Sequence, residues 1–254
     1  MAQSQAPRIF MIQSLRTALR SHRARRRARL AHWRAGWSAD LDAPGARRAA
    51  RYDMHVLDHG VIRVLWKNRA QIAPGIWRGN QPAPHDVADL AAMGIRTIVN
   101  FRGPNQWGSY LLEAEACAAH GITLVNGRLY SNTAPTPEQI HAALNLIETA
   151  EKPVFLHCKS GADRAGMASA LYLLAQGVAP KEAAKQLSWK YAHLRVSRTG
   201  ILDAFVAKYA AARAATGIGF LDWVDTAYDA QRLTSSFEGT RVTFRLMDWI
   251  LRRE

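Results

Sequence analysis

The residues whose chemistry stands out lie at positions 157–166, which read His-Cys-Lys-Ser-Gly-Ala-Asp-Arg-Ala-Gly. They follow an apolar run, residues 153–156, that has the length and composition of a buried strand. Gly161 and Gly166 permit a tight loop, and its backbone N–H groups can point inward where the next helix begins. Such a strand, loop and helix predict a cradle for an anion.

Two side chains of this loop carry the expected chemistry. The guanidinium of Arg164 can clamp two oxygens of a phosphate. A thiol at a helix N-terminus near cationic groups ionises readily, so Cys158 is expected to be a thiolate that can attack phosphorus. In α/β sheets ligands bind beyond the carboxyl ends of the strands, and this loop follows such an end.

Length and composition indicate a globular protein with its own core. The chain has 254 residues, 48% of them hydrophobic, and only two cysteines, Cys117 and Cys158. Two cysteines are too few for a disulfide framework, which favours a reducing, cytoplasmic compartment. Cys117 is expected to be a small buried hydrophobe, and the alternative is a disulfide with Cys158 that guards against oxidation.

The positive charge is concentrated at the N-terminus. Residues 1–39 contain nine arginines and no Lys, Asp or Glu, within a formal charge of +14 for the whole chain. This arm could form a basic helix on an anionic membrane, on a phosphate-rich polymer or on an acidic partner, which would make the protein peripheral to a membrane. The alternatives are a disordered, solvated tail or, in a eukaryote, a transit peptide. No stretch approaches the roughly 18 apolar residues of a membrane span.

Strand-like and helix-like segments alternate from about residue 74. The expected strands are residues 76–78, 95–101, 122–125 and 152–157, and the expected helices are residues 85–93, 109–120 and one that begins at Thr136 and Pro137. The last of these carries Ile140, Leu144 and Ile147 on one face. This alternation predicts an α/β fold with a central, mostly parallel sheet flanked by helices, because parallel strands need crossover connections.

Further helices are expected after the loop. They are residues 165–175, 180–191, 198–215 and 240–252. The chain is accordingly divided into a basic arm at 1–50, helical or disordered, an α/β domain at 51–215 and a helical C-terminal extension at 216–254.

The loop resembles the signature of cysteine-dependent protein tyrosine and dual-specificity phosphatases. Cys158 and Arg164 are separated by five residues, His157 precedes them and Gly166 follows. The resemblance covers residues 74–195. Within the family, the loop and its spacing are most similar to those of bacterial dual-specificity-like phosphatases. It implies that Cys158 forms a phosphocysteine that water then hydrolyses, that Arg164 and the loop amides stabilise the transferred phosphoryl group, and that His157 holds the loop and thiolate. It implies no metal and no cofactor. The remaining phosphate-binding residues are then Lys159, Ser160, Gly161, Ala162, Ala165 and Gly166.

The general acid is the first departure from the family's pattern. Most members carry an Asp on a separate loop before the cysteine, but residues 103–156 contain no Asp. Asp163 is the replacement that we expect, because myotubularin-like lipid phosphatases and a group of bacterial tyrosine phosphatases also carry Asp inside the loop before the Arg. The alternative is that Asp163 braces the loop by bonding backbone amides or an arginine.

Ala165 is the second departure, since many members have Ser or Thr there to help the thiolate leave. Slow turnover is therefore expected. Lys159 could add charge for a highly phosphorylated or lipid headgroup, or could be solvated. Arg102, at a strand end, and Arg128, in the expected acid loop, could reach the phosphate or pair with carboxylates. His193 is expected to be a hydrogen-bonded structural histidine.

The sequence thus predicts a metal-independent phosphomonoester hydrolase. Its substrate would be a phosphorylated protein or a phosphorylated lipid or inositol, and nucleic acid is not the expected partner. The alternative from another class is a phosphate-binding pseudophosphatase that acts as an adaptor.

Overall fold

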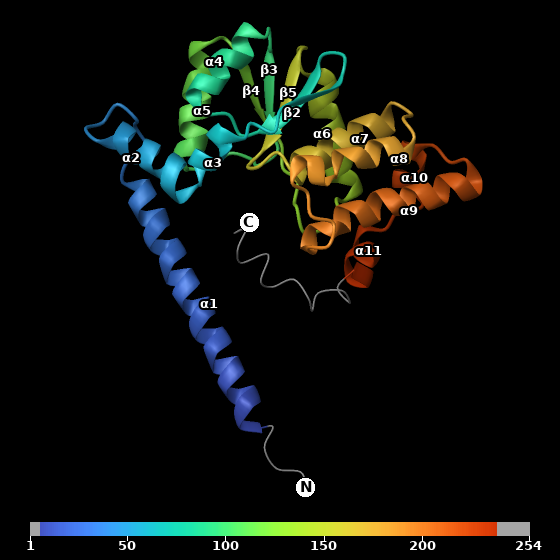
Figure 1. The fold of residues 1–254 in the computed structure, drawn as a ribbon, viewed down its shortest axis with the longest axis horizontal. Helices are drawn as coiled ribbons and strands as arrows, with labels where there is room; N and C mark the ends of the chain where they lie inside the picture. Colours follow the sequence, from blue (N-terminus) through green and yellow to red (C-terminus); the bar gives the residue numbers. More distant parts are fainter. Residues whose placement is uncertain (1–5, 238–254) are drawn as a thin grey trace.

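A five-stranded sheet forms the centre of the computed structural model, which describes residues 6–237 (Figure 1). From edge to edge the strands are β1 (Ala70–Ala73), β2 (Ile76–Asn80), β5 (Val154–Cys158), β3 (Thr97–Asn100) and β4 (Thr123–Asn126). β1 pairs with β2 in antiparallel fashion, and all the other pairs are parallel. The predicted mostly parallel α/β sheet is confirmed.

β5 is the middle strand and is buried along its whole length. Val154 and Leu156 face one hydrophobic cluster, whereas Phe155 belongs to the cluster on the opposite face. A parallel strand that is covered on both faces is apolar throughout, which is why this segment is recognisable in the sequence.

Helices cover both faces of the sheet. The Phe155 side is covered by α4 (Pro84–Ala92) and α5 (Gly108–Ala119), and the other side by α6 (Pro137–Thr149), α7 (Arg164–Ala175) and α9 (Ile201–Thr216). α6 begins as predicted, since the Thr136 hydroxyl accepts a hydrogen bond from the backbone N–H of Gln139. Its residues Ile140, Leu144 and Ile147 are buried on one face.

The C-terminal helices complete this second layer. α10 (Phe220–Thr226) inserts Trp223 against Phe205 of α9, with ring centroids 5.5 Å apart. α11 (Ala230–Phe237) follows, and its Leu233 joins the same cluster. These helices therefore share the core of the α/β domain. The helix expected at 240–252 lies outside the described residues.

The single helix expected at 180–191 is wrong. The segment contains α8 (Pro180–Ala183) and two 3₁₀ turns, Ala184–Gln186 and Trp189–Tyr191. The carbonyl of Gln186 accepts a hydrogen bond from Arg78 at 2.7 Å instead of continuing a helical ladder. This tertiary contact outweighs the helical propensity of the segment.

The sequence analysis did not predict β1. It also missed three elements in the segment before the sheet, which are α2 (Ala46–Tyr52), a π-helical turn (Asp53–Leu57) and α3 (Gly60–Leu65). The basic arm itself forms one helix, α1 (Ala6–Ala35), which leaves the domain on the side of α2 and α3 (Figure 1).

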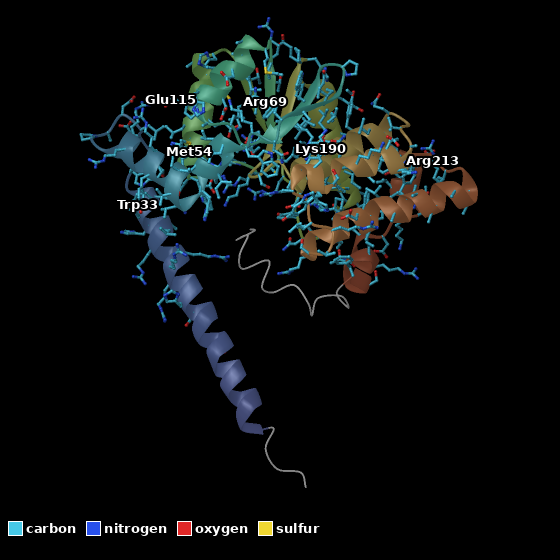
Figure 2. The ribbon with its side chains drawn as sticks, in the orientation of Figure 1. Trp33, Met54, Arg69, Glu115, Lys190 and Arg213 are labelled. Atoms are coloured by element: carbon cyan, nitrogen blue, oxygen red, sulfur yellow. The ribbon has the colours of Figure 1, made fainter. Side chains whose placement is uncertain are left out.

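The C-terminal end of α1 is fixed to the domain by a buried ion pair. Arg34 donates from Nε and Nη2 to the carboxylate of Asp53 at 2.9 and 2.7 Å. Asp53 also accepts the backbone N–H of Gly108 at the start of α5. Trp33, labelled in Figure 2 where α1 meets the domain, packs edge-on against Tyr52. A bidentate pair of this kind is both strong and orienting.

Within residues 6–237, no helix is both long enough and apolar enough to cross a membrane.

Candidate active site

The predicted loop joins the middle strand to α7. Cys158 ends β5 and is 2% exposed, and Arg164 begins α7 and is half-buried. Gly161 has φ +74°, and a Cβ there would lie 2.6 Å from the carbonyl carbon of Gly79. Only glycine allows the loop to bend this way and lie so close to β2.

Four consecutive loop carbonyls accept hydrogen bonds from outside the loop. The pairs are Lys159 O with Gln81 N at 3.2 Å, Ser160 O with Asn68 Nδ2 at 3.0 Å, and the carbonyls of Gly161 and Ala162 with Arg78 Nη2, the latter at 3.3 Å. In a trans peptide the N–H points opposite to the C=O of the preceding residue. The N–H groups of residues 160–163 therefore point away from the donors Gln81, Asn68 and Arg78, as an anion cradle requires.

Arg78, on β2, holds two of these carbonyls and was missed in the sequence. It is fully buried, its guanidinium lies 3.9 Å from the ring centroid of Tyr191, and it also binds the turn at Gln186. Burial lowers the pKa of Arg78 to about 10, and attraction to Tyr191, Cys158 and Asp163 opposes that shift. Arg78 is thus a cation at neutral pH behind the loop. A charged residue in an otherwise buried strand was the available signal.

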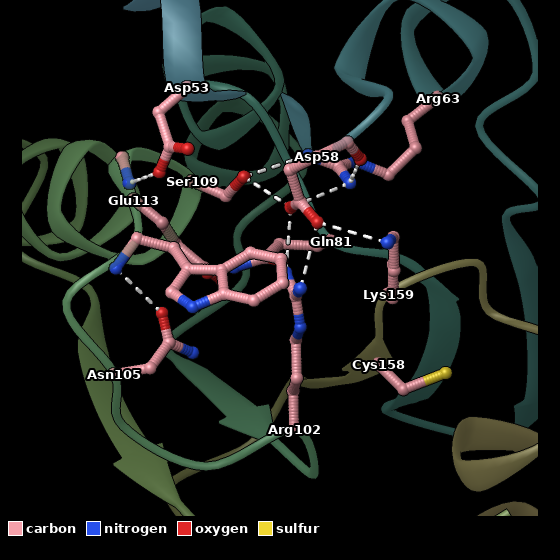
Figure 3. Close-up of polar contacts among 12 residues, drawn as sticks. Asp53, Asp58, Arg63, Gln81, Arg102, Asn105, Ser109, Glu113, Cys158 and Lys159 are labelled. Atoms are coloured by element: carbon pink, nitrogen blue, oxygen red, sulfur yellow. Dashed lines mark hydrogen bonds and ion pairs between the residues drawn. The ribbon is translucent and has the colours of Figure 1, made fainter. Parts of the chain in front are cut away.

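Asp58 is a second buried charge in contact with the loop, and the sequence analysis missed it as well. Asp58, fully buried, accepts hydrogen bonds from both terminal nitrogens of Arg102, from Arg63 and from Ser109 (Figure 3). Lys159 Nζ lies 3.1 Å from Asp58 Oδ1. Burial alone would raise the pKa of Asp58, but Arg102, Arg63 and Lys159 together hold it far below its usual range.

Two residues that were predicted as possible phosphate ligands, Arg102 and Lys159, instead contact Asp58 in this cluster. Arg102 is 4% exposed and pairs with a carboxylate, which is one of the two roles that the sequence left open. Lys159 is neither solvated nor directed to the loop interior. In Figure 3 its ammonium group points toward Asp58, whereas the sulfur of Cys158 points the other way.

His157 is buried next to a carboxylate. Its Nε2 lies 2.7 Å from Glu113 Oε1, although the two atoms are not aligned as a hydrogen bond. Its Nδ1 lies 3.3 Å from the carbonyl oxygen of Cys158. Glu113 in turn accepts a hydrogen bond from Gln81, whose backbone N–H holds the loop. His157 thus contacts the loop through the backbone of Cys158.

Asp163 is 6% exposed and has a histidine partner. His193 Nδ1 lies 2.7 Å from Asp163 Oδ1, and His193 Nε2 lies 2.7 Å from Asp203 Oδ2. Burial would lower the pKa of His193, but its hydrogen bonds to Asp163 and Asp203 outweigh this and raise it to about 8. At neutral pH both ring nitrogens therefore donate. His193 is hydrogen-bonded, as expected, but its partner is the predicted acid.

The remaining predicted loop residues are placed as follows. Ala162 and Ala165 are buried, and the Ser160 hydroxyl accepts the N–H of Ala162 at 3.4 Å. Gly166 lies inside α7, where a Cβ would approach the carbonyl oxygen of Gln186 to 2.7 Å. Its role is thus close packing of α7 on that turn.

Arg128 contacts Gly103, and Cys117 belongs to a hydrophobic cluster. Arg128 is exposed, and its guanidinium packs on Gly103, where a Cβ would lie 2.5 Å from Nη2. Cys117 is a free thiol in the hydrophobic cluster under α4 and α5, where burial and then the charge of Glu113 raise its pKa to about 12. It is a buried hydrophobe, and both cysteines are free.

Solved structures similar to this chain include several phosphatases. TpbA of P. aeruginosa is 18% identical, with 68% of this chain and 91% of that chain covered and a TM-score of 0.48. Tk-PTP in its active form is 20% identical, covering 58% and 99%, with a TM-score of 0.44, and PTPMT1 is 20% identical, covering 58% and 98%, also at 0.44. A search of the curated proteins found no match.

A mostly parallel sheet with a loop after its middle strand is the architecture that the resemblance to dual-specificity-like phosphatases implied. A family model settles the membership: the chain belongs to the family described as DSP-PTPase phosphatase fused to NAD+ kinase, whose model matches residues 66–200, more than half of the chain.

Proposed function

We propose that the protein hydrolyses phosphomonoesters through a phosphocysteine at Cys158. The observation that carries this proposal is the set of four loop carbonyls bound from outside, because it leaves the loop N–H groups directed away from the residues that bind those carbonyls. Preorganised amides of this kind stabilise a phosphoryl group in the transition state without reorganisation.

The reaction takes two steps. The Cys158 thiolate attacks phosphorus, the bond from phosphorus to the ester oxygen breaks, and a proton passes from His193 Nδ1 through Asp163 to the leaving alcohol. Water then attacks the phosphocysteine, loses a proton through Asp163 to His193, and releases phosphate and the thiolate. Arg164 and the loop amides neutralise the oxygens of the transferred group in both steps.

Asp163 is proposed as the acid because it belongs to the loop and has a proton-carrying neighbour. His193 lies 2.7 Å from its Oδ1 and is protonated at neutral pH. The same contact also supports the bracing role, so the two roles are separated by experiment, as described in the Discussion.

The proposed substrates are phosphotyrosine and other phosphorylated proteins, with lipid or inositol phosphates as the alternative, in the cytoplasm. The test is phosphate release from a panel of phosphopeptides, phosphoinositides and inositol polyphosphates, by wild type and Cys158→Ser, with EDTA present. We expect release that survives EDTA and is abolished by the substitution. Cys117→Ser is the matched control and should keep full activity, because Cys117 lies in a separate hydrophobic cluster.

Release that persists in Cys158→Ser would contradict the phosphocysteine. No release from any member of the panel, with binding of inorganic phosphate intact and lost in Arg164→Met, would instead establish the phosphate-binding adaptor.

A further inference from the structure

Helix α3 exposes its apolar residues and buries its charged residue, which is the reverse of an ordinary surface helix. Its one charged residue, Arg63, is 8% exposed and binds Asp58 in the interior. Its apolar residues and those beside it point outward. We call the α3 face the set of Val56, Val61, Ile62, Leu65 and Trp66, which are 53, 55, 62, 84 and 44% exposed. Surface helices normally turn such residues toward the core, and contiguous exposed apolar residues mark binding surfaces.

The α3 face is held rigidly beside the catalytic loop. Asn80, at the end of β2, donates from Nδ2 to the carbonyls of Arg63 and Trp66 at 3.0 and 2.7 Å. Two residues after Trp66, Asn68 binds the carbonyl of Ser160 in the loop. These hydrogen bonds thus fix the backbone on which the side chains of Leu65 and Trp66 are exposed.

A second exposed tryptophan belongs to the same surroundings. Asn68 Nδ2 also donates to the carbonyl of Tyr191 at 3.1 Å, in the 3₁₀ turn that begins with Trp189. Trp189 is 76% exposed, and Lys190 next to it is exposed as well (Figure 2). Tryptophan is favoured where an apolar phase meets water, because its ring is apolar and its N–H is polar.

The charge around the α3 face selects the partner. Between residues 43 and 85 the only acidic residues are Asp53 and Asp58, and both are fully buried. Arg48 and Arg51 on α2 are exposed, and α1 adds the arginines of the acid-free arm. Asp89, which is exposed, is paired with Lys67 next to Trp66. An apolar face flanked by these arginines complements a surface that is both apolar and negatively charged.

We propose that the α3 face inserts into the boundary between headgroups and acyl chains of an anionic lipid bilayer, with α1 bound along the headgroups. This goes beyond the proposed hydrolysis and does not depend on it. Insertion of Leu65 and Trp66 holds the Cys158 loop at the level of the headgroups, where phosphate esters of lipids and of membrane proteins lie.

The test is binding of the full chain to vesicles of phosphatidylcholine with and without phosphatidylglycerol, measured by flotation. The variant is Ile62→Ser with Leu65→Ser, and the matched control is Met93→Ser with Leu221→Ser, since both control residues are 40% exposed on other helices. We expect the α3 variant to lower the partition coefficient onto anionic vesicles by about tenfold or more, and the control pair to change it by less than about twofold. Thermal unfolding should be alike in the three proteins.

A depth measurement adds an independent readout. Brominated lipids should quench the tryptophan fluorescence of the bound wild type, and Trp66→Phe should remove a measurable part of that quenching. Vesicle binding that is the same in wild type and the α3 variant would overturn the proposal, because the arm would then suffice. Absence of wild-type binding would also overturn it, as would an α3 variant whose main effect is to convert a dimer to a monomer in sedimentation velocity. If the wild type binds anionic vesicles but does not hydrolyse aryl phosphates, the result would count against the proposed function alone.

Discussion

His193 Nδ1 and Asp163 Oδ1 lie 2.7 Å apart, although 30 residues separate them in the chain. Asp203 binds the other nitrogen of the same ring. The predicted general acid therefore sits at the end of a buried chain of carboxylate, imidazolium and carboxylate. Two properties follow from it, one of catalysis and one of stability.

Asp163→Asn should lower turnover on alkyl phosphates by about a hundredfold or more, because a poor leaving group needs a proton in the transition state. Aryl phosphates leave without that help and should lose far less. The measurement is kcat on both substrate types, with Asp222→Asn, at an exposed position of α10, as the control. Equal losses on both substrates would assign Asp163 to bracing of the loop.

His193→Gln should lose a pH-dependent part of its stability. The pKa of His193 is raised from 6.5 to about 8, so the protonated ring stabilises the folded state fully below pH 6.5, and this contribution disappears as the pH rises through 8. The shift corresponds to about 2 kcal/mol. The free energy of unfolding of wild type minus that of His193→Gln, measured by denaturant titration, should therefore be larger at pH 6 than at pH 9.

The control for this difference is His120→Gln, because His120 is exposed. It should behave like the wild type at both pH values. A difference between wild type and His193→Gln that does not change with pH would argue against the charged network.

Arg78→Lys should reduce kcat/KM on an aryl phosphate by roughly tenfold to a hundredfold, as the loss of an oxyanion-type contact does. Arg78 binds Gln186 through Nη1 and the carbonyls of Gly161 and Ala162 through Nη2. The single nitrogen of a lysine cannot occupy both positions, so the loop amides lose their fixed orientation. The affinity for vanadate should fall in parallel. Arg96→Lys, at an exposed position, is the control, and an Arg78 variant with normal kinetics would show that the loop holds its shape without this residue.

Asp58→Asn should destabilise the fold by about 3–5 kcal/mol, because it leaves the cations of Arg102, Arg63 and Lys159 buried around a neutral group. Asp89→Asn, which breaks an exposed pair with Lys67, should cost far less, because solvent screens exposed ion pairs. The measurement is the free energy of unfolding at neutral pH.

The same carboxylate predicts acid sensitivity. The pKa of Asp58 is lowered from 3.8 in the folded state, so its contribution is complete above that value and is lost as the pH falls further. Wild type and Asp58→Asn should therefore become more alike in stability below pH 3.8, and a gap that stays constant would contradict the assignment.

Ala165→Ser should raise kcat if release of the thiolate limits turnover, as expected from the family's hydroxyl at this position. Rapid quenching in acid should trap phosphoenzyme in the wild type and less of it in the variant. If no phosphoenzyme is trapped and Ala165→Ser does not raise kcat, release of the thiolate does not limit turnover.

The sequence alone predicted the elements whose signal is local. β5 was recognisable because a strand covered on both faces is apolar, and β3 because of its β-branched residues. α6 was recognisable by its Thr136 cap and by its buried residues at helical spacing. α3 was missed, because its outward face is apolar and its inward side chain is that of Arg63. The helix expected at 180–191 was broken by one contact to Arg78.

The sequence by itself determined which residues the loop carries, since Cys158, Asp163 and Arg164 lie within one turn between β5 and α7. Only the tertiary structure decided what surrounds them. Arg78 reaches the loop across 83 residues, and Arg102 reaches Asp58 across 44. A buried charge must find opposite charges or hydrogen-bond partners, and any distant segment that supplies them satisfies it. That requirement leaves no local pattern, so these partners appear only when the chain is folded.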